Sequence, residues 1–361
     1  MPLVPIGTPL EELDTPALVV DVVGLERNIA RMAEWSRRSG KAVRPHAKAH
    51  KTPLVARKQL DAGAVGICCS KLAEAEAMVQ GGIDRVLVTS EVVGAPKVVR
   101  LVGLARHAEV MVVVDDAANA EELSAAAEAA GLRLGVIVEV NVGQDRCGVA
   151  PGAPAAALAE RVARLPGLRF EGLQGYEGHL QHVYAAEERR AKCLEAMSRL
   201  GDSREAVERA GLEVRVCTTA GTGTHEIAGT CDWVTEVQPG SYIWMDADYL
   251  RVEGTPYRSA LTVLTGVVSR QRAGAAIVDA GTKSVSTDAG PAAVKGGRLT
   301  YAPMGDEHGR LIGDDLPALG ARVELIPSHC DTTVNLHDEL HVVRDGRLEA
   351  VWRIVGRGKV Q

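Results

Sequence analysis

The chain has 361 residues, of which 46% are hydrophobic and 24% are charged, and its formal net charge is −6. This composition is typical of a globular protein of one or two domains, and the interspersed charges of both signs argue against nucleic-acid binding. The N-terminus has no basic region before a long apolar run, and no apolar stretch is long enough for a membrane span, so we expect neither a signal peptide nor membrane insertion. Seven cysteines in a chain of this length are typical of reduced thiols, which favours the cytoplasm.

Helical and strand-like patterns alternate through the first 240 residues. Helices are expected at 23–39, 53–62, 72–80, 96–106, 117–130, 153–165 and 185–210. Strands are expected at 41–48, 65–70, 85–90, 109–114, 133–140, 168–176, 213–218 and 235–238. Apolar strands that alternate with helices indicate a closed parallel sheet, so we expect an α/β barrel of the TIM-like (β/α)8 type.

The pattern changes after about Arg251. Glycine, proline and aspartate turns separate strand-like runs at 261–270, 275–279, 298–302, 322–326, 339–344 and 347–355. These runs predict a C-terminal all-β domain, and its first strand is expected from Leu18 to Val20, before the barrel begins. We therefore expect a barrel over 22–250 and a β domain built from 1–21 and 251–361.

A basic cluster runs from Arg44 to Lys51, directly before the helix-start signal Thr52-Pro53. It therefore lies at the carboxyl end of a predicted strand, where barrel enzymes collect their catalytic side chains. If the strand continues through the cluster, four side chains share one face: Arg44, His46, Lys48 and His50. A lysine held among cations and away from water loses affinity for its proton and becomes a nucleophile. The alternative is a solvated basic turn.

Two loops near the end of the predicted barrel combine glycine with hydroxyl groups. Ala220 to Thr224 follows one strand, and Gln238 to Tyr242 follows the next. Glycine lets backbone N–H groups approach a phosphate, and barrel enzymes favour their last two loops for phosphate binding. Either loop alone could be a plain turn, but together they predict a phosphate site.

The segment from Tyr176 to His182 ends the sixth predicted strand with a phenol and two imidazoles. His179 or His182 could serve as a general base near neutral pH, and the alternative is a hydrogen-bonded structural histidine. Arg146 follows the fifth predicted strand, either as a site residue or as an exposed loop arginine.

A second cluster, Ser328 to Asp331, lies far away in the predicted β domain. In an extended segment His329 and Asp331 point to one side, and Cys330 points to the other. An imidazole and a carboxylate could share a divalent cation, with water and substrate oxygens as the remaining ligands of an open catalytic site. His329 and Asp331 are therefore candidate metal ligands.

Together these motifs resemble the fold-type III pyridoxal-phosphate enzymes, the alanine racemase-like group, and within it the D-threonine aldolase and D-serine dehydratase family. The resemblance covers the barrel, the β domain, the Pro-His-x-Lys-x-His-Lys pattern ending at Lys51, and the His329-Cys330-Asp331 motif. It implies that Lys48 binds pyridoxal 5′-phosphate covalently. The other implied cofactor contacts are Arg146 near the phenolic oxygen, Tyr176 beside the ring, and Thr222, Gly223, Gly240 and Ser241 at the phosphate.

Gln238-Pro239-Gly240 corresponds in this resemblance to an Arg-Pro-Gly motif of alanine racemases, in which the arginine faces the pyridine nitrogen of the cofactor. Gln238 is neutral, and we expect it to leave that nitrogen unprotonated, as the arginine does.

The metal pair distinguishes two subtypes of the family. Dehydratases tend to have His-x-Cys and zinc, whereas D-threonine aldolases have His-x-Asp and manganese or a similar ion. His329-Cys330-Asp331 is His-x-Asp in register, and oxygen with imidazole suits Mn²⁺ best, with Mg²⁺ or Co²⁺ as alternatives. A local bulge could instead turn the sulfur of Cys330 inward and give a dehydratase-like Zn²⁺ site.

The resemblance implies retro-aldol cleavage of a D-3-hydroxy amino acid, for example D-threonine to glycine and acetaldehyde. His179 or His182 would remove the proton of the β-hydroxyl, which the metal at His329 and Asp331 binds. The main alternative is dehydration of the same substrates on the same site. A non-catalytic carrier of the cofactor and a metal-dependent barrel hydrolase are two further alternatives. Enzymes of this fold type are commonly head-to-tail homodimers, so the metal pair could serve the Lys48 of the partner subunit.

Overall fold

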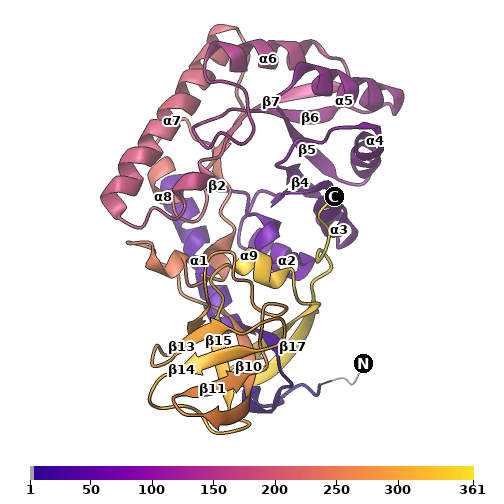
Figure 1. The fold of residues 1–361 in the computed structure, drawn as a ribbon. Helices are drawn as coiled ribbons and strands as arrows, with labels where there is room; N and C mark the ends of the chain where they lie inside the picture. Colours follow the sequence, from indigo (N-terminus) through magenta and orange to yellow (C-terminus); the bar gives the residue numbers. More distant parts are fainter. Residues whose placement is uncertain (1–3) are drawn as a thin grey trace.

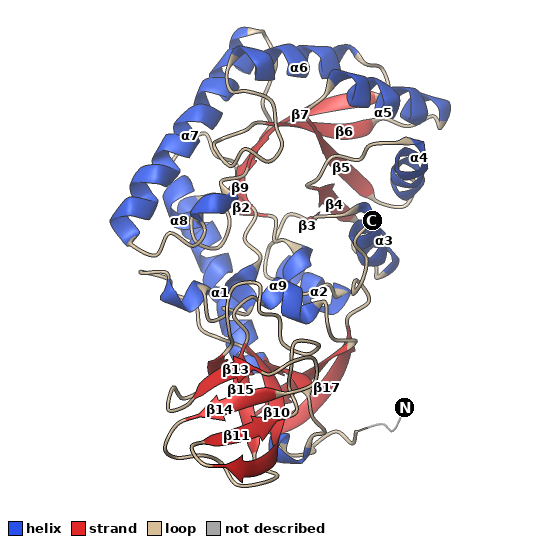
Figure 2. Ribbon diagram, viewed as in Figure 1, coloured by secondary structure: helices blue, strands red, loops and turns tan. Residues whose placement is uncertain are grey.

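The structure is a computed structural model that describes residues 4–361, and it contains two sheets with their associated helices (Figure 1). Residues 1–3 of the expected β domain lie outside the described residues. A parallel sheet with helices on its outer side forms the upper part of the molecule in Figure 2, and an antiparallel unit made almost entirely of strands forms the lower part.

The parallel sheet has eight strands in the order β2-β9-β8-β7-β6-β5-β4-β3. Its central strands are continuous apolar runs, since both of their faces are buried. The strands are β2 (Ala42–Val43), β3 (Ile67–Cys69), β4 (Arg85–Val88), β5 (Glu109–Val114), β6 (Leu134–Glu139), β7 (Leu168–Gly175), β8 (Val216–Thr219) and β9 (Glu236–Val237). The predicted parallel barrel is confirmed.

The barrel closes between its first and second strands through isolated contacts. The amide of Cys68 donates to the carbonyl of Pro45 at 2.8 Å, and His46 forms a single parallel bridge with Cys68. The expected strand from 41 to 48 was too long, because β2 ends at Val43. Proline has no N–H group for the ladder, and after His46 the chain turns into a 3-10 helix at Ala47–Ala49.

Helices surround the parallel sheet where the apolar periodicity predicts them. Asp21 caps the first helix by accepting a hydrogen bond from the amide of Val23, and Gly40 ends it at a φ of 68°. The long helices are α1 (Val22–Ser39), α2 (Pro53–Asp61), α3 (Leu72–Gln80), α4 (Ala95–Leu104), α5 (Ala117–Ala129), α6 (Ala153–Arg164) and α7 (Ala186–Arg209). The short ones are α8 (His225–Ala228) and the 3-10 helices Leu10–Glu12, Ala47–Ala49, Gly178–Leu180, Ser241–Ile243 and Tyr249–Arg251.

The second sheet has nine strands in the order β11-β14-β13-β12-β15-β10-β1-β16-β17, and β11 also pairs with β10. This extra pairing closes part of the sheet into a small antiparallel barrel. The strands are β1 (Ala17–Asp21), β10 (Leu261–Arg272), β11 (Ala275–Val278), β12 (Ala293–Val294), β13 (Thr300–Pro303), β14 (Gly309–Ile312), β15 (Arg322–Ile326), β16 (Glu339–Arg344) and β17 (Arg347–Arg353). The N-terminal strand therefore joins this sheet, as expected.

Three elements differ from the sequence expectation in the second half. The short strands β12 and β14 were missed, because runs of two and four residues carry almost no periodicity. The segment after His329, expected to be extended, is the helix α9 (Cys330–Val334), which packs against the 3-10 helix Ala47–Ala49. Figure 1 shows α9 between the barrel and the strands of the β domain.

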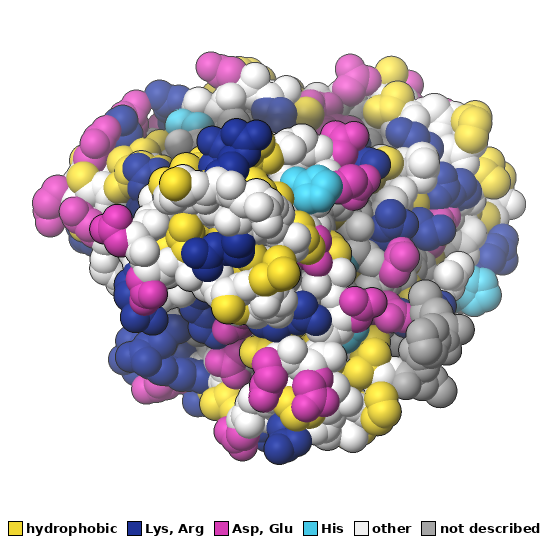
Figure 3. Space-filling view, turned by 60° about the horizontal axis from the view of Figure 1, so that its bottom comes forward, with side chains coloured by type: hydrophobic (Ala, Val, Ile, Leu, Met, Phe, Trp, Pro, Cys, Tyr) yellow, Lys and Arg dark blue, Asp and Glu magenta, His cyan; other side chains and the backbone are white. Residues whose placement is uncertain are grey.

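Charged side chains of both signs occur across the face shown in Figure 3, together with scattered hydrophobic atoms. Among residues 4–361, no helix combines the length and the apolar composition that a membrane span requires.

Candidate functional site

Lys48 lies in the turn that follows β2 and points into a cavity at the carboxyl ends of the barrel strands. His46 fixes this turn, because its Nδ1 accepts a hydrogen bond from the Lys48 amide while its Nε2 lies 3.0 Å from the Thr89 hydroxyl. The residues that line the cavity are His46, Lys48, Ser70, Thr89, Ser90, Arg146, Gln174, Tyr176, Gly221, Thr222, Gln238, Gly240, Ser241 and Tyr249.

The expected common face of the basic cluster is only half right. His46 and Lys48 line the cavity, but Arg44 forms a buried ion pair with Glu236 at 2.9 Å. His50 is fully buried, and its Nδ1 accepts a hydrogen bond from the Thr52 amide. The strand alternation that predicted one face ends with β2 at Val43, so the later side chains follow the geometry of the turn.

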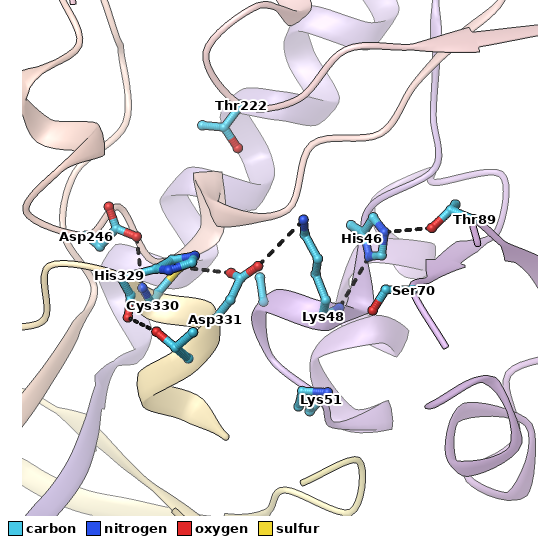
Figure 4. A network of polar contacts seen from close by, with 12 residues as sticks. His46, Lys48, Lys51, Ser70, Thr89, Thr222, Asp246, His329, Cys330 and Asp331 are labelled. Carbon is cyan, nitrogen blue, oxygen red and sulfur yellow. Dashed lines mark hydrogen bonds and ion pairs between the residues drawn. The ribbon is translucent and has the colours of Figure 1, made fainter. Parts of the chain in front are cut away.

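The amine of Lys48 faces a carboxylate and a phenol ring. Its Nζ lies 3.8 Å from Oδ2 of Asp331 (Figure 4). The centre of the Tyr176 ring lies 5.8 Å from the same Nζ. Arg146 approaches the same ring, with its Cζ 5.5 Å from the centre. The loops after β2, β6 and β7 and the β domain thus meet around the amine of Lys48.

The pKa of Lys48 lies above its usual value, so the expectation of a lowered pKa is wrong. Burial lowers it, but the charges of Tyr176 and Asp331 outweigh burial and the opposing charge of Arg146. At neutral pH the amine is therefore protonated, and a neighbour must take its proton before it can act as a nucleophile.

Residues of both glycine loops line the cavity. Among residues 4–361, the amides of Thr222, Gly240 and Ser241 have no hydrogen-bond acceptor. The two loops are tied together, because the hydroxyl of Thr222 accepts from the Tyr242 amide at 2.9 Å. Gly240 packs against the rest of the site, and a Cβ there would lie 3.3 Å from Cβ of His46. Free N–H donors opposite a lysine amine fit a phosphorylated aldehyde such as pyridoxal phosphate.

Sequence reasoning missed the residues that hold the first loop. The carboxylate of Glu177 accepts hydrogen bonds from the Ala220 amide and the Thr224 hydroxyl. Gln181 Oε1 accepts from the Gly223 amide at 2.9 Å, so this N–H already has a partner, and Gly223 does not line the cavity. Both residues lie between Tyr176 and His182, a segment in which only Tyr176 and the two histidines were candidates from the sequence.

The candidate metal ligands stand at the start of α9. Asp246, from the barrel, accepts a hydrogen bond from the Cys330 amide at 2.9 Å and so caps this helix (Figure 4). The thiol of Cys330 is fully buried and donates to Asp331 Oδ1 at 3.3 Å. His329 Nδ1 lies 2.6 Å from Oδ2 of Asp288, which leaves its Nε2 for a cation. An imidazole nitrogen and a carboxylate oxygen fit a divalent metal with open positions.

The two histidines of the loop after β7, His179 and His182, lie in different places. His182 packs on Tyr249, with ring centres 4.4 Å apart, and its Nε2 lies 3.5 Å from Oδ2 of Asp248. Burial lowers the pKa of His182, although Asp248 opposes this, so the ring is neutral at physiological pH. His179 is exposed and lines a different groove, beside Gly143 and Arg199.

Glu139, the last residue of β6, is a buried carboxyl beside the cavity. Burial, reinforced by Glu91, raises its pKa to about 8 from an ordinary 4.5, and Arg146 opposes the rise. The folded state therefore holds this proton more tightly than the unfolded chain does. We predict that this residue lowers the free energy of unfolding as pH rises from about 4.5 to 8, by at most ~1.4 kcal/mol per pH unit.

Urea unfolding across this window checks the prediction. Glu139→Gln should have a flatter stability profile than the wild type, because a glutamine has no proton to lose. An identical slope in the two proteins would contradict the raised pKa.

The comparisons with known proteins agree with this geometry. Residues 20–248 match the family model "Alanine racemase, N-terminal domain", and residues 260–343 match "Putative serine dehydratase domain". A D-threonine aldolase of Arthrobacter sp is 43% identical, with 98% of this chain and 95% of that protein covered. A 3-hydroxy-D-aspartate aldolase of Paracoccus denitrificans (strain Pd 1222) is 38% identical, with 98% of this chain and 94% of that protein covered.

Two solved structures extend the comparison. The D-threonine aldolase from Filomicrobium marinum superposes with a TM-score of 0.97 at 42% identity, covering 99% of each chain. The D-threo-3-hydroxyaspartate dehydratase from Delftia sp. HT23 superposes with a TM-score of 0.86 at 29% identity, covering 96% of this chain and 98% of that one.

A parallel barrel that opens onto a lysine amine, joined to an antiparallel β domain that carries a histidine and an aspartate, defines a fold-type III pyridoxal-phosphate enzyme. The chain belongs to the D-threonine aldolase and D-serine dehydratase family of these enzymes. The family named from the motifs alone is therefore confirmed.

Proposed function

We propose that the protein cleaves D-3-hydroxy amino acids by a retro-aldol reaction, with D-threonine giving glycine and acetaldehyde. The observation that carries this proposal is the 3.8 Å approach of Asp331, one of the candidate metal ligands, to the amine of Lys48. A substrate bound at Lys48 would place its β-hydroxyl next to the metal ligands. The aldolases among its relatives share more of its sequence than the dehydratase does.

Lys48 is the residue that binds pyridoxal 5′-phosphate in this proposal, and the cofactor, when bound, stabilises the electron pair released as the Cα–Cβ bond breaks. Tyr176, Arg146 and Gln238 line the cavity and would contact the ring of the cofactor. The amides of Thr222, Gly240 and Ser241 bind the phosphate. Gly223 shapes the loop without donating to it, because Gln181 accepts its N–H.

His329 and Asp331 would hold a divalent cation, which would supply positive charge to the β-hydroxyl of the substrate. The neutral ring of His182 takes the proton of that hydroxyl, since the ring lies near Lys48, His329 and Asp331. The electron pair of the O–H bond forms the carbonyl of the leaving aldehyde, and Cα then gains a proton to give glycine. His179 has no part in this scheme, because it lies in another groove.

Dehydration is the second candidate function, because Cys330 stands between the two candidate metal ligands. Its thiol lies 3.3 Å from Asp331 Oδ1, so a small change at the start of α9 would offer sulfur to a metal. The D-threo-3-hydroxyaspartate dehydratase from Delftia sp. HT23 belongs to the same family. In the structure the thiol is buried and donates to Asp331, which supports the aldolase assignment.

A product assay separates the two functions. The purified protein is incubated with pyridoxal phosphate, Mn²⁺ and D-threonine, and the products are identified. Glycine with acetaldehyde, lost on chelation and regained with added Mn²⁺, supports the aldolase. Formation of 2-oxobutanoate and ammonia would reassign the protein as a dehydratase, and neither product would refute both functions.

Three further properties belong to the proposal. Mn²⁺ is the preferred metal, because His329 and Asp331 offer nitrogen and oxygen but no thiolate. The protein is a head-to-tail homodimer, as the family resemblance implies, and its seven cysteines, typical of reduced thiols, favour the cytoplasm. Residues 22–250 form the cofactor-binding unit, and residues 1–21 with 251–361 form the unit that carries the metal pair. Sedimentation of the purified protein tests the dimer.

Asp288 should strengthen metal binding by orienting His329. Its carboxylate lies 2.6 Å from His329 Nδ1 and also accepts from the hydroxyls of Ser286 and Thr332, so its position is fixed from three sides. We predict that Asp288→Ala weakens Mn²⁺ binding about 10- to 100-fold, the usual effect of losing such an orienting carboxylate. Titration followed by Mn²⁺ electron paramagnetic resonance measures this affinity.

The control is Asp314→Ala, which removes an exposed carboxylate elsewhere in the β domain and should leave Mn²⁺ affinity unchanged. Equal affinities of Asp288→Ala and the control would show that Asp288 does not orient the ligand.

A further inference from the structure

The loop from Ala220 to Thr224 is held by His225, the first residue of α8. The amide of His225 donates to the carbonyl oxygen of Gly221 at 3.1 Å, and Nδ1 of its ring lies 3.0 Å from the carbonyl oxygen of Thr222. The side chain is buried and does not line the cavity. One residue outside the cavity therefore binds two consecutive carbonyl groups of the loop.

The partners of the His225 ring fix its hydrogens. A carbonyl oxygen can only accept, so Nδ1 carries the hydrogen that binds Thr222. Burial lowers the pKa of His225 to about 4, so at neutral pH Nε2 accepts from the hydroxyl of Tyr257 at 3.1 Å. Protonation of the ring would add a hydrogen at Nε2 and leave the one at Nδ1 in place. The bond to Thr222 is therefore present in both charge states of the imidazole.

The backbone on both sides of Thr222 is fixed by these contacts. The peptide that follows it is bound at both ends, since His225 binds the carbonyl of Thr222 and Gln181 Oε1 accepts from the Gly223 amide at 2.9 Å. The peptide that precedes it is bound at the carbonyl of Gly221, which accepts from the amide of His225. In this trans peptide the N–H group points opposite to the carbonyl, so the N–H of Thr222 points away from the start of α8.

Thr222 lines the cavity and keeps two hydrogens free for a bound anion. Among residues 4–361, its amide has no acceptor. Its hydroxyl oxygen accepts from the Tyr242 amide at 2.9 Å, and no residue in the same range accepts the hydrogen of that hydroxyl. A backbone N–H group and a hydroxyl on one residue are suitable donors for the oxygens of a phosphate group.

We propose that His225 is a positioning residue for the cofactor: by binding the carbonyls of Gly221 and Thr222, it directs the amide and the hydroxyl of Thr222 to the phosphate group. This inference rests on the proposed function, which places pyridoxal phosphate in the cavity. His225 acts on the loop and does not line the cavity. Its loss should therefore weaken the binding of the phosphate and leave the bond between Lys48 and the aldehyde unaffected.

The test compares pyridoxal phosphate with pyridoxal, which carries the same aldehyde without the phosphate. The affinity of the cofactor-free protein for each is measured from the visible absorbance of the aldehyde bound to Lys48. The wild type should prefer the phosphorylated form. In His225→Leu this preference should fall about 10- to 100-fold, which corresponds to one hydrogen bond to a charged group, and the affinity for pyridoxal should stay as in the wild type.

Two polar variants test the same bond where His225→Leu fails to fold. His225→Asn places an NH₂ group where Nδ1 stood, so it should keep most of the preference. His225→Gln places that group where Nε2 stood and should lose the preference. The control is His337→Leu, which removes another imidazole bound to a carbonyl oxygen, that of Ser284 at 2.8 Å in the β domain, and should leave the preference unchanged.

An unchanged preference in His225→Leu, or equal preferences in His225→Asn and His225→Gln, would overturn the inference and leave the proposed function intact. Equal losses of affinity for both aldehydes would also overturn it, because a residue that only supports the fold affects both alike. A wild-type protein that binds neither aldehyde at Lys48 would instead refute the proposed function and the inference together.

Discussion

Lys48→Ala is expected to abolish turnover of D-threonine, with kcat lower by more than about 10³-fold. In the proposed function this amine bonds to the cofactor and exchanges with the substrate, and among residues 4–361 no other lysine lines the cavity. The neighbouring Lys51 cannot replace it, because its Nζ is paired with Glu74 at 3.0 Å. The measurements are steady-state kinetics and the visible absorbance of the bound cofactor.

Lys48→Arg sharpens this test. Arginine keeps a cation opposite Asp331, so it preserves the ion pair at the metal ligand, but it stays protonated and cannot bond to an aldehyde. It should be as inactive as Lys48→Ala, whereas Lys97→Ala, at an exposed position, should match the wild type. Turnover near the wild-type value in Lys48→Arg would refute the assignment of Lys48.

His182→Ala is expected to lower kcat by about 10²- to 10⁴-fold, the range for loss of a general base. Cofactor absorbance should persist, because His182 lies beside Asp248 and Tyr249 and not among the residues that line the cofactor cavity. The same kinetic and spectral measurements apply to this variant.

His179→Ala is the matched control, because it makes the same substitution three residues away. His179 lies in the groove near Arg199, so its variant should stay within about twofold of the wild type. A larger loss in His179→Ala than in His182→Ala would reverse the roles of the two histidines and refute the proposed base.

The barrel and its family could be predicted because their signals are local. In a chain that alternates strands with amphipathic helices, apolar runs such as 109–114 and 134–139 indicate parallel strands that are buried on both faces. The Lys48 motif and the His329-Cys330-Asp331 motif are likewise short. They can be recognised from their residues even where the secondary structure is predicted wrongly. An exposed loop arginine remained an alternative for Arg146, and its place beside Tyr176 came only from the structure.

The sequence by itself determined the fold class and the family, and it predicted the lysine and the two candidate metal ligands, because periodicity and residue chemistry are properties of adjacent positions. The tertiary structure alone decided whether His179 or His182 lies near Asp331, how α9 begins, and which side chains join Glu139, Gln174 and Gln238 in one hydrogen-bonded network. These depend on contacts between distant segments: Asp246 with Cys330, Asp288 with His329, and Glu139 with Gln174. A hydrogen bond between two packed elements leaves no local pattern, since either partner alone reads as an ordinary polar residue.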